Sequence, residues 1–261
     1  MKKFLCVVAI LFAGVLGTTL RADENAPPKV GIMEKLGQTI PLDAAFYDET
    51  GQLRTLKSFI TKPTILALVY YRCPGICTPL LNELATNVRK VDLKLGRDYQ
   101  ILTVSFDQRE TPDIAADKKD NYLTLVGEDV DPQAWRFLTG DSVNIRRLTD
   151  AVGFYFMPSP DSNWVHPAAL VFLSPEGKIT RYFNGIQYLP FDIKMGVIEA
   201  SNGKVGPTIA RLLQYCYSYD SEGQRYTLDF MRVAGILILG LVGVFAIVFL
   251  IKPKKKQGET K

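Results

Sequence analysis

The stretch TILALVYYRCPGICTPL, residues 64–80, decides the fold of this 261-residue chain. Its first half, residues 64–71, is an unbroken apolar run rich in β-branched and aromatic residues, which is typical of a strand buried on both faces. The motif CPGIC (73–77) follows at once, and apolar residues at helical spacing come after it, at positions 80, 81, 84, 88 and 91. The sequence therefore predicts a buried strand, a turn that carries two cysteines, and a helix.

The rest of the chain predicts further alternation of strands and helices. The expected elements are a hairpin around the turn DETG (48–51), strands at 100–106, 134–138, 168–173 and 178–183, and helices at 112–123, 141–152 and within 191–213. This order is that of a thioredoxin-like α/β domain, in which helices flank a central mixed sheet. We assign residues 37–214 to this domain and residues 23–36 to a linker or irregular lead-in.

The two ends of the chain predict a signal peptide and a membrane anchor. Residues 1–22 begin with two lysines and continue as an uncharged apolar run, so we expect a cleaved signal peptide, with an uncleaved anchor as the alternative. We assign residues 232–251 to a C-terminal transmembrane helix, because 233–251 are 19 consecutive apolar or glycine residues, close to the number that spans a bilayer. The lysines of the tail 252–261 favour a cytoplasmic C-terminus.

These ends determine the expected compartment and the meaning of the net charge. The domain is expected on the periplasmic, extracytoplasmic side of the bacterial inner (cytoplasmic) membrane, with residues 215–231 as its juxtamembrane segment. The chain carries +4 overall, but residues 1–22 carry +3 and residues 252–261 carry +4, which leaves −3 for residues 23–251. The domain therefore has no excess positive charge for a phosphate backbone, and we expect no nucleic-acid partner.

Cys73, Cys77 and the only histidine, His166, are the candidate metal ligands. If the helix begins inside the motif, positions i and i+4 place both sulfurs on one face of its first turn, where the helix N-terminus favours thiolates. In a thioredoxin-like sheet, the loop before the late strand 168–173 lies against this turn and brings His166 to the sulfurs. Two thiolates and one imidazole suit three-coordinate Cu(I), or Cu(II) with an added ligand, whereas structural zinc normally takes four protein ligands.

Other interpretations of these residues remain open. A structural disulfide between Cys73 and Cys77 would close a very short loop and stabilise the fold little. The same pair could instead act as the redox centre of a thiol–disulfide oxidoreductase, which needs no imidazole; a copper or redox sensor is a further alternative. We interpret Cys216 as a single, partly buried thiol, with an intermolecular bridge or a third sulfur ligand as its alternatives. We interpret Asp107, Asp113, Asp117 and Asp120 as a solvated helix face.

Three segments resemble the Sco/SenC family of thioredoxin-fold copper proteins. They are YYRCPGICTP (70–79), VSFDQRETP (104–112), and His166 with the strand pair that follows it, and the resemblance covers roughly residues 37–213. It implies that Cys73, Cys77 and His166 bind copper and that residues 109–112 are scaffold near the site. Thioredoxins place a cis-proline near the position of Pro167, so a cis peptide bond between residues 166 and 167 is a further hypothesis.

The resemblance also implies a function. Members of the family deliver copper to, or mature, the binuclear copper A centre of cytochrome c oxidase. We therefore expect a membrane-anchored metallochaperone rather than an enzyme. Its expected partners are the copper-bearing subunit of the oxidase or another copper carrier.

Overall fold

The computed structural model describes residues 29–127, 130–205, 217–220, 225–228 and 245. Two compact units divide the chain, Met1–Val205 and Gly206–Lys261. The described part of the second unit is mainly a hairpin of β12 (Tyr217–Asp220) and β13 (Arg225–Leu228), which the sequence did not predict. The predicted signal peptide (1–22) and cytoplasmic tail (252–261), Cys216, and the predicted transmembrane helix (232–251) except Phe245 lie outside the described residues. Among the residues that are described, no helix is both long and apolar enough to cross a membrane.

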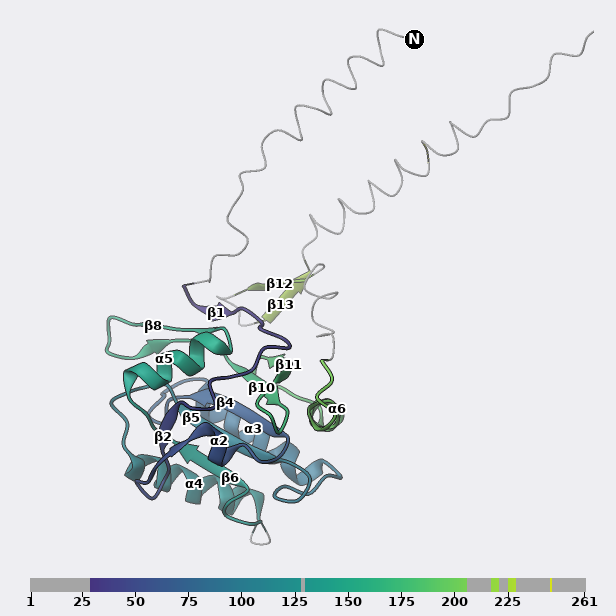
Figure 1. The fold of residues 1–261 in the computed structure, drawn as a ribbon. Helices are drawn as coiled ribbons and strands as arrows, with labels where there is room; N and C mark the ends of the chain where they lie inside the picture. Colours follow the sequence, from purple (N-terminus) through teal and green to yellow (C-terminus); the bar gives the residue numbers. More distant parts are fainter. Residues whose placement is uncertain (1–28, 128–129, 206–216, 221–224, 229–244, 246–261) are drawn as a thin grey trace, which may run out of the picture. The chain divides into compact units, whose positions relative to one another are not determined.

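A five-stranded mixed sheet forms the centre of the first unit, in the order β11-β10-β4-β5-β6 (Figure 1). The three parallel strands are β4 (Thr64–Val69), β5 (Gln100–Ser105) and β6 (Trp135–Leu138). On the other side of β4, β10 (Ala169–Leu173) runs antiparallel to it and pairs with β11 (Ile179–Asn184). Every residue of β4 and β5 is buried, which explains the largely apolar sequence of β4; β5 also buries the polar residues Gln100, Thr103 and Ser105.

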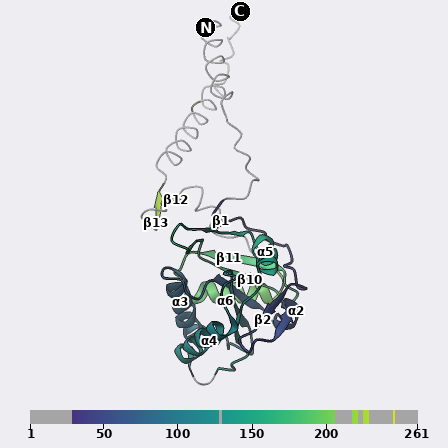
Figure 2. The same ribbon diagram turned by 90° about the vertical axis from the view of Figure 1, so that its left-hand side faces the viewer.

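Helices cover both faces of this sheet. Figure 2 shows α3 (Cys77–Lys90) and α4 (Pro112–Val126) on one side, and α2 (Leu56–Phe59) and α5 (Ser142–Ala151) on the other. The last helix of the unit, α6 (Pro190–Ser201), packs against α3, β10 and β11. The predicted thioredoxin-like arrangement of a mixed sheet between helices is therefore confirmed.

Three small strand pairs of the first unit lie outside its central sheet. They are β2 (Ala45–Tyr47) with β3 (Leu53–Thr55), β1 (Gly31–Ile32) with β7 (Phe154–Tyr155), and β8 (Met157–Pro158) with β9 (Trp164–Val165). The first is the hairpin predicted around residues 48–51. The second corrects the lead-in 23–36, because residues 31 and 32 pair with the domain. The third lies within residues 157–165, where the sequence predicted no strand.

Candidate metal centre

The sheet topology brings the cysteine motif and His166 to the same edge. β10 runs antiparallel to β4, with Leu170 opposite Ala67. The carboxyl end of β4, which leads into Cys73, therefore lies beside the amino end of β10, which follows His166. The expectation that a loop 89 residues beyond Cys77 returns to the motif is confirmed.

The three donor atoms converge. The His166 Nε2 atom lies 3.8 Å from Cys73 Sγ and 3.6 Å from Cys77 Sγ, and all three ligand atoms lie within 4.8 Å of one another. Metal–sulfur and metal–nitrogen bonds of about 2.3 and 2.0–2.1 Å, taken from zinc and set about 120° apart, would separate sulfur from nitrogen by about 3.8 Å. The observed distances match such a site, and both cysteines are free thiols.

The imidazole of His166 is oriented as in a metal ligand. Its Nδ1 atom lies 2.9 Å from the carbonyl oxygen of Pro167. Since a carbonyl only accepts hydrogen bonds, Nδ1 is the donor in this contact. The Nε2 atom faces the two sulfurs and is the nitrogen that would bind a metal, as in histidine ligands whose other nitrogen donates to a carbonyl.

A turn, rather than one helix face, brings the two sulfurs together. Helix α3 begins at Cys77, so Cys73 precedes the helix, and the expected i,i+4 arrangement within the first helical turn is wrong. Cys73 is instead held by its own N–H, which donates to the Tyr70 carbonyl at 3.2 Å, and its Sγ accepts the Gly75 N–H at 3.4 Å. Pro74 and Gly75 shape this turn. Among the described residues no peptide bond is cis, so the hypothesis of a cis bond before Pro167 is also wrong.

The two thiols differ in their protonation. The hydrogen bond from Cys77, helped by His166 and opposed by burial, lowers the pKa of Cys73. The same hydrogen bond and the burial of Cys77, which is 3% exposed, raise the pKa of Cys77. The thiolate therefore forms on Cys73 in the turn. This corrects the expectation that the helix N-terminus favours thiolates at both positions.

Aromatic rings surround the imidazole. The ring centroid of His166 lies 5.5 Å from that of Tyr70, in an edge-on contact, and 5.1 Å from that of Phe106. Burial, followed by interaction with the Cys73 sulfur, raises the pKa of Tyr70, so its phenol stays protonated. The wall of rings keeps water from this side of the imidazole and strengthens its interactions with charge.

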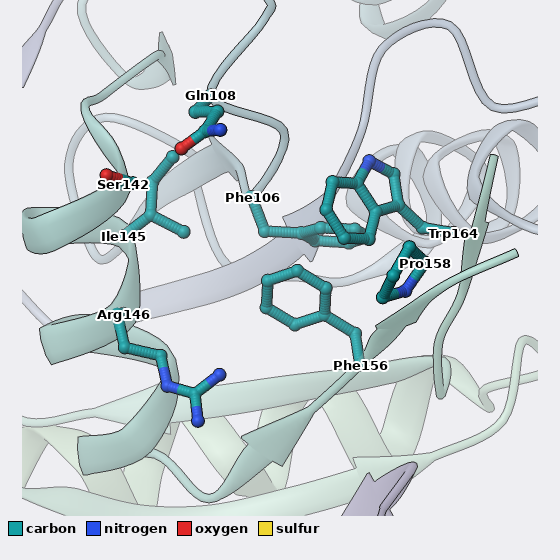
Figure 3. Close-up of a pocket in the computed structure, with 8 residues that line it drawn as sticks. All are labelled: Phe106, Gln108, Ser142, Ile145, Arg146, Phe156, Pro158 and Trp164. Carbon is teal, nitrogen blue, oxygen red and sulfur yellow. The ribbon is translucent and has the colours of Figure 1, made fainter. Parts of the chain in front are cut away.

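A cavity of about 430 Å³ lies beside this wall (Figure 3). The rings of Phe106, Phe156 and Trp164 gather on one side of it, and α5 contributes Ile145 and Arg146 on the other. Trp164 packs edge-on against Phe156, with ring centroids 5.2 Å apart. Phe106 lines the cavity and also packs against His166, so the two features share a wall.

The segment after β5 also differs from its sequence interpretation. Asp107 is 4% exposed and pairs with Arg109 at 2.7 Å, so it does not belong to a solvated helix face; Asp113, Asp117 and Asp120 are exposed, as predicted. Burial opposes ionisation of Asp107, yet hydrogen bonds from Arg109 lower its pKa overall. Glu110, one of the residues expected as scaffold near the site, is 5% exposed and accepts hydrogen bonds from the backbone in front of Cys73. The structure therefore confirms Glu110 as scaffold, and the sequence did not predict these particular contacts.

A thioredoxin-like domain with two thiols and an imidazole at one sheet edge defines a class of thiol- or metal-handling proteins. Comparison with known proteins identifies the family within this class. The SCO1/SenC family model matches residues 37–193, more than half of the chain. This chain belongs to the SCO1/SenC family.

Individual relatives agree with this assignment. The chain is 27% identical over 196 residues to the mitochondrial SCO2 homolog of Bos taurus, covering 70% of each protein. Among solved structures, it resembles an Aquifex aeolicus VF5 protein whose suggested role is electron transfer, with a TM-score of 0.58, 27% identity, and coverage of 65% of this chain and 95% of that one. It shares its fold with Arabidopsis thaliana ScoI, a structure with copper bound, at a TM-score of 0.52, 21% identity, and coverage of 64% and 99%.

Proposed function

We propose that this protein is a membrane-anchored, extracytoplasmic copper metallochaperone that acts in the assembly of cytochrome c oxidase. Copper would be its cargo, held by Cys73, Cys77 and His166. The receiver would be the copper-bearing subunit of the oxidase, whose binuclear copper A centre is thereby completed, or another copper carrier. Membership of the SCO1/SenC family and the donor set of the site support this proposal.

One observation carries the choice of metal. Two sulfurs and the Nε2 atom of His166 converge, and the group found among the described residues contains these three donors. Soft thiolates select Cu(I), which accepts three ligands, whereas hard cations prefer oxygen ligands and structural zinc prefers four donors. The donor set therefore fits cuprous ion better than the common alternatives.

The accessibility of the site suits a carrier. Cys77 is buried, but Cys73 is only partly buried, and the neighbouring Pro74 and Gly75 are exposed. A thiolate of the receiving protein could therefore approach from the Cys73 side and replace the ligands one at a time. A membrane tether would raise the effective concentration of the carrier near a membrane-bound receiver.

The test of this function is copper loading. The full chain, reduced and reconstituted anaerobically with Cu(I), should retain one copper ion per molecule after desalting. Cys77→Ser and His166→Ala should lower this stoichiometry, whereas Cys216→Ser, a matched cysteine change outside the proposed ligand set, should not. Full copper retention by Cys77→Ser would refute the proposal.

The anchor needs its own test. The proposed helix at 232–251 predicts that the full chain stays in bacterial membranes after alkaline carbonate extraction, whereas a chain ending at residue 231 is released. Release of the full chain would contradict the membrane anchor and would leave the copper site untouched.

A second function, thiol–disulfide exchange, is favoured by the asymmetry of the two thiols. The partly buried Cys73 has the lowered pKa of an attacking thiolate, and the buried Cys77 could resolve the mixed disulfide. His166→Ala separates the two functions. Copper retention should fall in this variant, whereas reduction of a client disulfide should persist if exchange is the main activity.

A further inference from the structure

Two adjacent residues of the loop between β5 and α4, Arg109 and Glu110, contact the two segments that carry the metal ligands. Glu110 contacts the segment that leads into Cys73. One of its carboxylate oxygens accepts the Tyr71 N–H at 2.7 Å and the Ser105 hydroxyl at 2.6 Å, and the other accepts the Arg72 N–H at 2.7 Å. The two amides belong to the residues directly before Cys73. Glu110 therefore fixes the backbone from which the cysteine turn starts.

Arg109 contacts the segment that leads to His166. Its guanidinium donates to both carboxylate oxygens of Asp107, at 2.8 and 2.7 Å, and to the Ser162 carbonyl at 3.0 Å. It also lies over the ring of Trp164, with its central carbon 5.5 Å from the ring centroid. Ser162 and Trp164 belong to the β8–β9 hairpin, whose chain reaches His166 two residues after Trp164.

Burial and local geometry restrict the partners of the two contacts. Glu110 is 5% exposed, and Asp107, which orients the guanidinium of Arg109, is 4% exposed, whereas the side chain of Arg109 itself is 50% exposed. Ser162 has a φ of 66°, a conformation unusual for a residue with a side chain. The carbonyl of this strained turn accepts the Arg109 hydrogen bond, so the turn and the guanidinium fix each other.

We propose that Arg109 and Glu110 are positioning residues that together set the separation between the two sulfurs and the His166 imidazole. This inference rests on the proposed function, since copper is the ligand whose binding would report the separation. Glu110 holds the cysteine turn, Arg109 holds the hairpin that leads to His166, and their peptide bond links the two. Loss of an outer partner that orients metal ligands typically lowers metal affinity about 10–100-fold.

The test compares Arg109→Met, Arg109→Lys and Glu110→Gln with two matched controls. Gln keeps the size of Glu110 but places an N–H₂ group opposite one of the backbone donors. Lys keeps the charge of Arg109 but lacks the planar guanidinium that donates to Asp107 and Ser162 at the same time. The controls are Arg97→Met, which removes an exposed pair with Asp98, and Glu199→Gln, which removes a partly buried pair with Arg181 far along the sheet from the site.

The first readout is copper. Arg109→Met and Glu110→Gln should lower Cu(I) affinity, measured by competition with a chelator, about 10–100-fold. They should also shift the sulfur-to-Cu(II) charge-transfer band, which a loss of stability alone would leave in place. Arg109→Lys should recover part of the affinity, and both controls should bind like wild type. Wild-type affinity and an unshifted band in Arg109→Met and Glu110→Gln would overturn the inference while leaving copper binding by the wild type intact.

The second readout needs no copper and separates this inference from the proposed function. In the copper-free protein, hydrogen–deuterium exchange should speed up at the amides of residues 71 and 72 in Glu110→Gln, and across residues 159–166 in Arg109→Met. Unchanged exchange in these segments would overturn the inference even if the wild type bound no copper. If Glu110→Gln fails to fold, the two Arg109 variants still carry the test.

Discussion

The thiolate of the copper-free, reduced protein lies on Cys73, while Cys77 keeps its proton. The rate at which iodoacetamide alkylates Cys73 should therefore change less than about twofold between pH 5 and pH 8, because a pKa lowered to about 3 leaves this sulfur as thiolate throughout. An ordinary thiol with a pKa of about 8.5 would react nearly 1,000-fold faster at pH 8 than at pH 5. Cys77, which is buried and holds the shared proton, should stay unmodified.

Peptide mapping by mass spectrometry assigns the modification among the four cysteines of the chain. The internal control is Cys77→Ala, which removes the hydrogen bond that contributes most to the lowered pKa of Cys73. In this variant the rate profile of Cys73 should move to higher pH. A wild-type profile that rises with a midpoint near 8.5, or faster modification of Cys77 than of Cys73, would refute this account of the thiol pair.

Three substitutions test the scaffold. Arg136→Met removes the cation shared by the buried carboxylates of Asp48 and Glu49; Asp48 loses its ion pair, whereas Glu49 keeps Lys119. The loss should cost about 3 kcal/mol and lower the melting temperature by about 6–12 °C in calorimetry. An unchanged melting temperature would show that the Arg136 ion pairs contribute nothing. Gly153→Ala should detach β1 from β7, because a Cβ at this position, where φ is +64°, would lie 1.8 Å from the Met33 carbonyl oxygen. Amide hydrogen exchange at residues 31–33 should therefore become faster than in the wild type, and unchanged exchange there would contradict this. Tyr71→Phe removes the hydroxyl that donates to the Leu138 carbonyl at 2.7 Å. The free energy of unfolding, measured by urea titration, should fall by about 1–2 kcal/mol. An unchanged free energy of unfolding would contradict this.

The main fold was predictable because buried strands and helices show recognisable patterns of apolar residues in the sequence. β4 is buried at every position and appears as a largely apolar run, and β5, also buried throughout, keeps apolar residues at positions 101, 102 and 104. The site was predictable for a related reason. Once β4 and β10 are neighbours, the ends that carry Cys73 and His166 must meet at one edge of the sheet.

Other features of the structure show no such pattern in the sequence. β8 and β9 contain two residues each, too few for any alternation to be visible, and include Pro158 and the exposed Val165. The helix start at Cys77 depends on the local turn geometry, which residue spacing does not determine. Asp107 and Glu110 belong to networks whose other members are distant in sequence. Asp107 binds Arg109, which in turn donates to the Ser162 carbonyl. Glu110 accepts the N–H groups of Tyr71 and Arg72.

The coordination of copper tests the central proposal most directly. X-ray absorption spectroscopy of the Cu(I)-loaded full chain should show two sulfur neighbours at about 2.3 Å and one nitrogen at about 2.0–2.1 Å, by analogy with zinc–ligand distances. The nitrogen should disappear in His166→Ala, and one sulfur should disappear in Cys77→Ser. A wild-type spectrum without nitrogen, or one unchanged by His166→Ala, would contradict a copper site built from Cys73, Cys77 and His166.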